Sequence, residues 1–352
     1  MKIKKTKSLL YIFSSVMVLG LSFLSFDNSK PSSLTVEHAT PTLKETSKDK
    51  NTPKNPTAIL TPTVTPTPTP SIVDLKVAIE IKPAEDEMGV ILTEQITAYL
   101  KEKYSSPNTN VKEISNIICY YKEGLSYVDY IVYASYDVKY IGSNVIIPTL
   151  EEYCVTMNEN DFMIHSEVLD EEVKEALRLA RKDCASVRTL YIKETIRRFM
   201  NAKLACDEAL LSELVTDSSY LNINDISTKT QYIERYENLQ FLIRELPKEI
   251  TEVHFIAYVA NDVKIVNIAT LAPGMDEYMI TFNEENYPKI FYGKTSSTTD
   301  EHRISSKTQE DFQTLYNDVI NRLADAMLSD PDLLEFIERI KNATNSSTEQ
   351  QQ

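Results

Sequence analysis

The sequence predicts an α+β protein of two tandem cone-like units, in each of which helices pack on a curved antiparallel sheet. Two segments, residues 131–159 and 256–284, match at a fixed offset of 125 residues and are identical at eleven of 29 positions. A period this long indicates a duplicated domain, because solenoid repeats are about 20–50 residues long. In the second copy, helical patterns precede several β-branched and aromatic runs, the order expected when a sheet wraps around helices.

The N-terminus predicts export from the cytoplasm. A basic segment, residues 1–7, precedes an uncharged apolar stretch of 19 residues, residues 8–26, which is about the length that crosses a bilayer. The lysines favour the cytoplasmic side, and no good small-residue cleavage motif precedes Asp27. We therefore expect an extracytoplasmic protein anchored in the membrane by residues 8–26. The alternative is a cleaved signal peptide, which would leave the protein secreted.

The next segment, residues 27–72, predicts a disordered stalk. Residues 31–71 contain eight of the 15 prolines, together with eleven threonines. Such a segment cannot bury enough apolar surface to offset the entropy of ordering it, and proline favours extended backbone. We expect it to hold the rest of the chain away from a membrane or a cell wall.

The charge is unevenly distributed along the chain. The formal net charge is −15, but residues 1–71 carry a net charge of +5, so the remainder carries −20. A body this acidic repels phosphate backbones, which argues against a nucleic acid partner. The simplest role of the charge is solubility, and attraction of cations is the alternative.

The first copy of the repeat is degenerate and truncated. It shows one clear helical pattern, within residues 89–114, so it either lacks a helix or takes cover from residues 73–82. The segments of the body are a first, degenerate repeat at residues 73–168, a helical linker at residues 169–185, a second repeat at residues 186–294, C-terminal helices at residues 305–341 and a disordered tail at residues 342–352.

The second repeat allows its elements to be placed more closely. Helical spacing and a good N-cap at Asp207 define the helices, and β-branched and aromatic runs bounded by Pro, Asn or Gly define the strands. The expected helices are residues 186–204, 207–215 and 225–236, and the expected strands are residues 239–245, 252–266, 275–283 and 288–292.

The order of these elements resembles a known superfamily. A helix is followed by DEALLSEL at residues 207–214, by YIERYENL at residues 232–239, by the DVK strand at residues 262–264 and by a proline-containing strand pair. This resembles the nuclear-transport-factor-like superfamily, which includes ketosteroid isomerase and polyketide cyclases, and more narrowly tandem proteins of this fold exported by Gram-positive bacteria. The resemblance covers residues 85–340. It implies a cone that often holds a pocket, used for catalysis, binding or dimerisation.

Signatures of catalysis, metal binding and cofactor binding are missing from the sequence. It contains no Gly-rich phosphate loop, no G-x-S-x-G, no H-E-x-x-H and no paired C-x-x-C. We therefore assign no catalytic residue, no metal ligand and no cofactor.

The period of two along a strand still predicts one ligand site. Tyr133 and Asp137 share one strand face, as do Tyr258 and Asp262 in the second copy. The resemblance to ketosteroid isomerase implies an acid and a tyrosine oxyanion donor in the cone, so we predict these four residues to bind a ligand. No catalytic residue of the family transfers onto them. The alternative is a solvent-exposed sheet face on which the aspartates pair with lysines on neighbouring strands.

A run of basic residues follows the first copy. We expect a solvated helix face, and an interdomain contact with the acidic body is the alternative. The run comprises Arg178, Arg181, Lys182, Arg188, Arg197 and Arg198.

Together these observations predict a non-enzymatic, surface-tethered or secreted binding protein, whose partner is a protein, an envelope component or a small molecule. Two alternatives stay open: a cone-pocket enzyme of isomerase or cyclase type, and a carbohydrate or cell-wall binding module. Filled cones with a large apolar surface patch would favour the first function. Buried acids with a shifted pKa in a closed pocket would favour the second function, and a flat row of exposed tyrosines would favour the third. The oligomeric state stays open as well.

Overall fold

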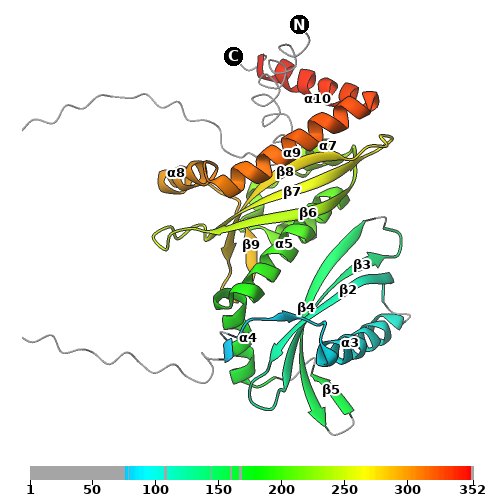
Figure 1. Ribbon diagram of the computed structural model, residues 1–352, viewed down its shortest axis with the longest axis vertical. Helices are drawn as coiled ribbons and strands as arrows, with labels where there is room; N and C mark the ends of the chain where they lie inside the picture. The colour runs from blue at the N-terminus through cyan, green and yellow to red at the C-terminus, as the bar shows by residue number, and fades with distance from the viewer. Residues whose placement is uncertain are drawn as a thin grey trace, which may run out of the picture.

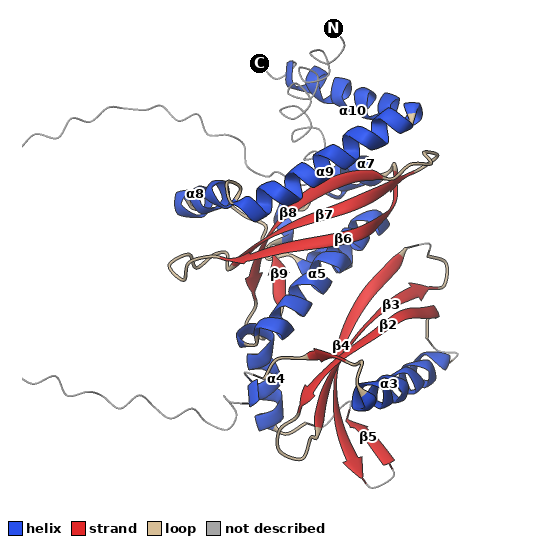
Figure 2. Cartoon of the chain, viewed as in Figure 1, coloured by secondary structure: helices blue, strands red, loops and turns tan. Residues whose placement is uncertain are grey.

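The computed structural model describes residues 76–77, 79–106, 109–143, 145–158, 161–165 and 169–349 (Figure 1). The predicted basic segment, signal anchor and stalk lie outside these residues. Within the described part, no helix has both the length and the apolar character needed to cross a membrane. This part is α+β, with two open antiparallel sheets, one of five strands and one of four (Figure 2).

The described helices lie before, between and after the two sheets. The helices are α3 (Glu87–Ser105), α4 (Glu171–Asp183), α5 (Ala185–Ala205), α6 (Glu208–Leu214), α7 (Ile223–Thr230), α8 (Ser297–Ser306), α9 (Glu310–Ser329) and α10 (Pro331–Glu349).

The first sheet has the linear order β1-β2-β3-β4-β5, with every neighbouring pair antiparallel. Its central strand β3 is buried along most of its length, because helices cover both faces. The strands are β1 (Lys82–Pro83), β2 (Val111–Glu123), β3 (Tyr130–Tyr140), β4 (Ile146–Asn158) and β5 (Asp161–His165).

The second sheet has the linear order β6-β7-β8-β9, again antiparallel throughout. Its strand β7 is buried on both faces in the same way as β3. The strands are β6 (Ile233–Glu245), β7 (Phe255–Ile265), β8 (Ala272–Phe282) and β9 (Pro288–Ile290).

Each sheet has an inner and an outer face, named here by the helices that cover them. On the first sheet, α3 packs on the inner face through Leu92, Ile96 and Leu100, and α4 with the first half of α5 packs on the outer face. On the second sheet, the rest of α5, α6 and α7 cover the inner face, and α8 and α9 lie over the outer face (Figure 1). Helix α10 packs beyond α9, at the end of β7.

Helix α5 therefore serves both sheets. Val187 and Tyr191 belong to the core on the outer face of the first sheet, whereas Ile192 and Ile196 belong to the core on the inner face of the second. Figure 1 shows α5 running between the two sheets. Because α5 contributes apolar side chains to both cores, it joins them.

The duplication is visible in the backbone as well as in the sequence. Strands β2 and β6 each shift register, between Ser115 and Ile118 and between Glu237 and Gln240. At each shift an asparagine, Asn116 or Asn238, has a φ of 53°, a left-handed conformation that asparagine tolerates better than most residues.

The repeat also extends into the helices that follow each sheet. The sequence Thr-Leu-Tyr occurs at residues 189–191 in α5 and at residues 314–316 in α9, at the same offset of 125 residues. Arg197 in α5 and Arg322 in α9 keep this offset. Helix α9 is thus the counterpart of α5 on the outer face of the second sheet.

The structure differs most from the sequence prediction at four places, the first being the start of β6, which is Ile233 instead of residue 239. The predicted helix at residues 225–236 is too long, because α7 ends at Thr230 and Ile233 already pairs with β7. Helix α8 is missing from the prediction, since few of its residues are apolar and its periodicity is weak. The predicted disordered tail, residues 342–352, overlaps α10, which continues to Glu349.

Replacement of Ile196 by alanine tests the shared role of α5. Ile196 is fully buried on the inner face of the second sheet, so Ile196→Ala should lower the free energy of unfolding by about 2–5 kcal/mol. The matched control is Asn321→Ala at the equivalent, exposed position of α9, which should change it by less than about 0.5 kcal/mol. Urea unfolding followed by circular dichroism measures both. Equal small effects would contradict the role given to α5.

Candidate functional site

The four residues predicted to bind a ligand lie on the outer faces of the two sheets. Tyr133 and Asp137 point from β3 toward α4 and α5, and Tyr258 and Asp262 point from β7 toward α8 and α9. All four are buried. The shared strand faces are confirmed, but each pair lies under a helix, and the two pairs lie on different sheets.

The two aspartates occupy equivalent polar clamps, each made of an asparagine, an aspartate and an arginine. Asn116 Nδ2 donates to Asp137 Oδ2 at 2.8 Å, and Arg197 Nη2 donates to Asp137 Oδ1 at 3.1 Å. The asparagine comes from the strand bulge and the arginine from the helix above it. The alternative of lysine pairs across strands is wrong for both aspartates, because arginines from the following helices take that place.

The second clamp repeats the first in every part. Asn238 Nδ2 donates to Asp262 Oδ2 at 2.7 Å, and Arg322 of α9 pairs with Asp262 Oδ1. Both arginine contacts are charge-assisted hydrogen bonds to a buried carboxylate, which are stronger than neutral ones. The clamps therefore fix α5 and α9 on their sheets.

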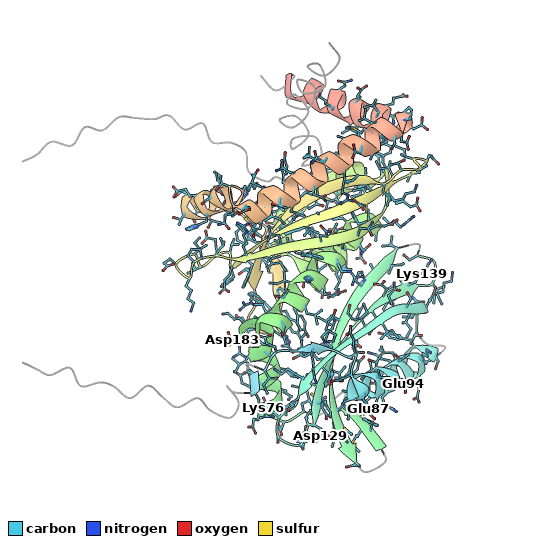
Figure 3. The ribbon with its side chains drawn as sticks, in the orientation of Figure 1. Lys76, Glu87, Glu94, Asp129, Lys139 and Asp183 are labelled. Carbon is cyan, nitrogen blue, oxygen red and sulfur yellow. The ribbon has the colours of Figure 1, made fainter. Side chains whose placement is uncertain are left out.

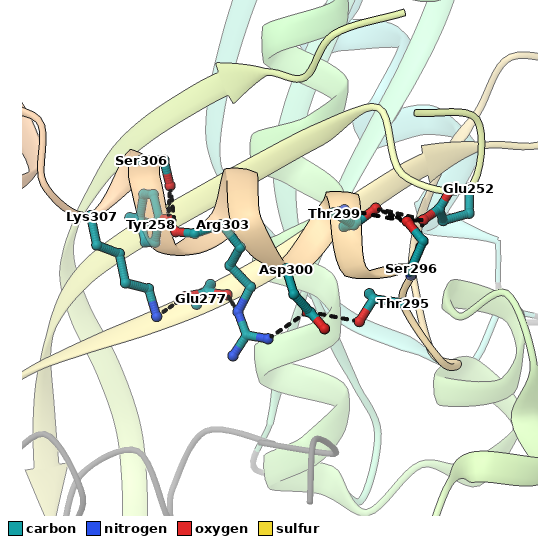
Figure 4. Close-up of polar contacts among 10 residues, drawn as sticks. All are labelled: Glu252, Tyr258, Glu277, Thr295, Ser296, Thr299, Asp300, Arg303, Ser306 and Lys307. Carbon is teal, nitrogen blue, oxygen red and sulfur yellow. Dashed lines mark hydrogen bonds and ion pairs between the residues drawn. The ribbon is translucent and has the colours of Figure 1, made fainter. Parts of the chain in front are cut away.

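The two tyrosines pack against the same helices. The Tyr133 ring lies edge-on to Tyr191 at 6.4 Å, and burial raises the pKa of Tyr133 well above its ordinary value. Tyr258 lies edge-on to Phe312 at 4.6 Å and bonds to Ser306 (Figure 4). Burial raises the pKa of Tyr258 to about 12. The Tyr133 ring and the Tyr258 ring and hydroxyl therefore contact the covering helices, whereas the Tyr133 hydroxyl is buried without a hydrogen-bond partner among the described residues.

Carboxylates on the outer faces also hold α4 and α8. Glu277 on β8 pairs with Arg303 and Lys307 of α8 (Figure 4), as Glu152 on β4 pairs with Arg181 of α4 at 2.6 Å. At the other end of α8, hydrogen bonds from Ser296 and Thr299 lower the pKa of Glu252 to about 2.

The basic run following the first copy largely makes contacts of this kind. Four of its members pair with acidic residues instead of facing solvent alone. The alternative, an interdomain contact, holds for Arg197, and Arg181 of the linker contacts both repeats. Arg181 also donates to the Glu285 carbonyl and lies 4.0 Å from the Tyr287 ring. The pairs are Arg181 with Glu152, Arg188 with Glu245, Arg197 with Asp137 and Arg198 with Glu213.

The inner face of the first sheet carries a polar cluster that the sequence analysis did not find. Lys103 Nζ of α3 lies 2.8 Å and 2.9 Å from the two oxygens of Glu151 on β4. Tyr153 also donates to Glu151, and Tyr104 and Tyr136 share a hydrogen bond of 3.0 Å. Burial opposes ionisation of Glu151, but the hydrogen bonds from Lys103, Tyr153 and Tyr136 outweigh it and lower its pKa.

The inner face of the second sheet carries the counterpart of this cluster. Lys203 Nζ of α5 lies 3.5 Å from the Tyr278 hydroxyl and interacts electrostatically with Asp276. Asn261 Nδ2 donates to Asp276 Oδ2 at 2.7 Å. Burial lowers the pKa of Lys203, and the charge of Asp276 acts in the opposite direction.

The correspondence between these two inner clusters follows two offsets in the sequence. Glu151 and Tyr153 of β4 match Asp276 and Tyr278 of β8 at 125 residues. The inner helices match at 100 residues, an offset that a search for a single period misses. The matched helix pairs are Leu92 with Ile192, Ile96 with Ile196, Tyr99 with Phe199, Leu100 with Met200 and Lys103 with Lys203.

The two inner clusters differ in exposure. The side chains of Lys103 and Glu151 are 35% and 31% exposed, whereas Lys203 and Asp276 are buried. The difference arises because α6 and α7 cover the inner face of the second sheet, while the chain passes from α3 to β2 without a further helix. Neither cluster contains an unpaired carboxylate, so neither provides a candidate general base.

In the described part of the chain, no group of three or more His, Cys, Asp or Glu side chains is arranged to hold a metal ion. Comparisons with protein-family models, with curated proteins and with solved structures gave no significant match.

Double-mutant cycles should distinguish the two inner clusters. Lys203→Met with Asp276→Asn should give a coupling energy of about 2 kcal/mol, because both groups are buried. Lys103→Met with Glu151→Gln should give less than about 1 kcal/mol, because water screens a half-exposed pair. Urea unfolding of each single and double variant measures both values. Equal coupling in the two cycles would contradict the assigned difference.

The pH dependence of stability should reveal Glu194, a buried residue of α5. Burial raises the pKa of Glu194 above its ordinary 4.5, against opposing contributions from Arg197 and Ser135. The contribution of Glu194 to the free energy of unfolding is therefore fully present below pH 4.5 and is lost as the pH rises through the raised pKa.

Glu194→Gln should remove this loss, so the variant should gain stability relative to the natural chain as the pH rises from 4.5 toward 7. The gain should follow a slope of up to about 1.4 kcal/mol per pH unit, the limit for a group that binds one proton in the folded state and none in the unfolded state. Thermal unfolding across that range measures the difference. A difference independent of pH would show that Glu194 titrates normally.

Proposed function

We propose that this chain is a non-enzymatic binding protein of the extracytoplasmic surface, in which two tandem cone-like units of the nuclear-transport-factor-like type stand on a Thr/Pro stalk. Residues 8–26 would anchor it in the membrane, or would be cleaved to release it. Its partner would be a protein or an envelope component, bound on the outside of the units. A small molecule bound inside them is the less favoured form of the proposal.

The cone-like arrangement is supported by the layers around each sheet. A helix from earlier in the chain lies on the inner face, and the strands that follow wrap it in sequence order. The bulges at Asn116 and Asn238 support curvature, because a bulge bends a strand and increases its twist.

The observation that carries the proposal is that side chains of the chain itself fill both inner faces. On the second sheet, Phe199 lies edge-on to Tyr278 at 6.0 Å and to Tyr292 at 5.9 Å. On the first, Tyr99 lies edge-on to Tyr153 at 5.6 Å. Aromatic packing of this kind stabilises a core and leaves little space for a ligand.

The two alternative functions have less support. An enzyme of isomerase or cyclase type needs an acid with a raised pKa next to substrate. The inner carboxylate of Glu151 has a lowered pKa and is paired. Burial raises the pKa of Glu194, but this residue pairs with Arg197 and Ser135 between α5 and the first sheet. A carbohydrate module needs aromatic rings in one row. The exposed tyrosines of the described chain lie on separate elements, and they are Tyr127, Tyr140, Tyr220, Tyr232 and Tyr287.

The surface of the units carries exposed acidic side chains. Glu87 and Glu94 on α3 are exposed and point away from the first sheet (Figure 3). An acidic outer surface speeds association with a basic partner and suppresses association with acidic ones.

Titration with benzene, followed by NMR of ¹³C-labelled tyrosine rings in the full chain, tests the filled interior. Benzene enters dry apolar cavities larger than itself, so Tyr153 and Tyr278 should show no saturable shift. Met200→Ala, which leaves a cavity against the second sheet, should produce one at Tyr278. Saturable shifts in the natural chain would favour a small-molecule pocket and contradict the proposal.

A further inference from the structure

The first described segment of the chain closes the edge of the first sheet. Its residues 76–77 and 79–83 lie along this edge and end in β1, where Lys82 pairs with Tyr121 of β2. The Ile81 amide donates to Ser186 Oγ at 2.9 Å, and Glu80 accepts from the Ser186 amide at 2.7 Å. Here this segment is called the strap.

Apolar and polar contacts together hold the strap in place. Val77 and Ile81 pack in the core between the first sheet and α4–α5. Lys122 Nζ donates to the Val77 carbonyl at 3.0 Å, and Cys184 Sγ lies 3.4 Å from the Ile79 carbonyl. The strap therefore rests on β2 and on the N-terminal turn of α5.

The second sheet has no strap in the described chain. Strand β6, the counterpart of β2, is the terminal strand of its sheet. Beside it is an open hollow of about 920 Å³. Its lining comprises Gln240, Gln309, Glu310, Asp311, Thr314, Leu315 and Asp318.

The hollow lies at the repeat positions that the strap covers on the first sheet. Gln309 and Asp311 of the lining correspond, at an offset of 125 residues, to Cys184 and Ser186. Both of these residues contact the strap directly. Leu315 likewise corresponds to Leu190, which packs against the same core as Ile81.

We propose that β6 and this hollow bind an extended segment of a partner polypeptide, which adds to the sheet as an antiparallel strand beside Leu242 and Ile243. Addition of a strand to an exposed edge is a common mode of peptide recognition. Such a segment places an apolar residue over Leu315, as the strap places Ile81 near Leu190. The inference rests on the proposed binding function and assigns a surface to it.

The lining determines which charge the partner carries. A carboxylate at the strap position of Glu80 would face Glu310 and Asp311, where the first sheet has Ala185 and Ser186. Arg244 pairs with Asp311, and Arg322 lies 3.6 Å from Asp318, whereas Glu310 is exposed at the start of α9. The partner segment therefore bears lysine or arginine at that position.

Two labelled peptides test this inference on the full-length chain. One has the strap sequence of residues 76–84, and the other differs only by Glu80→Lys. Fluorescence anisotropy should show that the lysine peptide binds up to about fivefold more tightly, because one exposed charge pair is worth up to about 1 kcal/mol. The difference should shrink at 1 M salt, where charges are screened within about 3 Å.

A charge reversal in the hollow locates the site. Glu310→Lys should abolish or invert the preference for the lysine peptide. Glu301→Lys, an equivalent change on the exposed surface of α8, should leave it unchanged. Peptide that instead displaced the strap from the first sheet would be insensitive to Glu310→Lys.

Such insensitivity, equal affinity for the two peptides, or no binding at millimolar concentration would overturn the inference. Failure of the proposed function would have a different result, which is the binding of benzene inside the units. The two failures can therefore be distinguished.

Discussion

Helix α5 is buried between the two sheets, and the rest of the structure depends on this shared position. Val187 and Tyr191 pack on the outer face of the first sheet, and Ile192 and Ile196 pack on the inner face of the second. Each sheet needs the same helix for part of its cover, because most helical stability in proteins comes from tertiary packing. The duplicated chain is thereby held together through one element that belongs to both copies.

The same constraint explains where the duplication ends. Helix α9 repeats the clamp of α5, with Arg322 in place of Arg197. Its other side differs, because Asn317, Asn321 and Asp325 stand where α5 has Ile192, Ile196 and Met200. This side of α9 therefore lacks the apolar residues through which α5 packs on the second sheet. The last described element is α10, which packs against Leu323 and Met327 of α9.

Much of the fold could be predicted from the sequence. The helix that covers each sheet face and the polar clusters could not, because they depend on tertiary contacts. The offset of 125 residues and the period-two strands predicted two related sheets, and they correctly placed Tyr133 with Asp137 and Tyr258 with Asp262 on shared faces. Periodicity does not say which helix covers a face, so these residues were assigned to a ligand site although they hold helices. The inner clusters around Lys103 and Lys203 were missed because their helices match at a different offset from their strands.

Native-state hydrogen exchange of amides in β3 and β7 tests most directly whether α5 makes one cooperative structure of the two sheets. If both sheets depend on α5, the slowest amides of β3 and β7 should open with the same free energy, equal to that of global unfolding. Destabilising α5 should lower both values together. Exchange from β3 at a much lower free energy, with α5 and β7 still protected, would contradict the account.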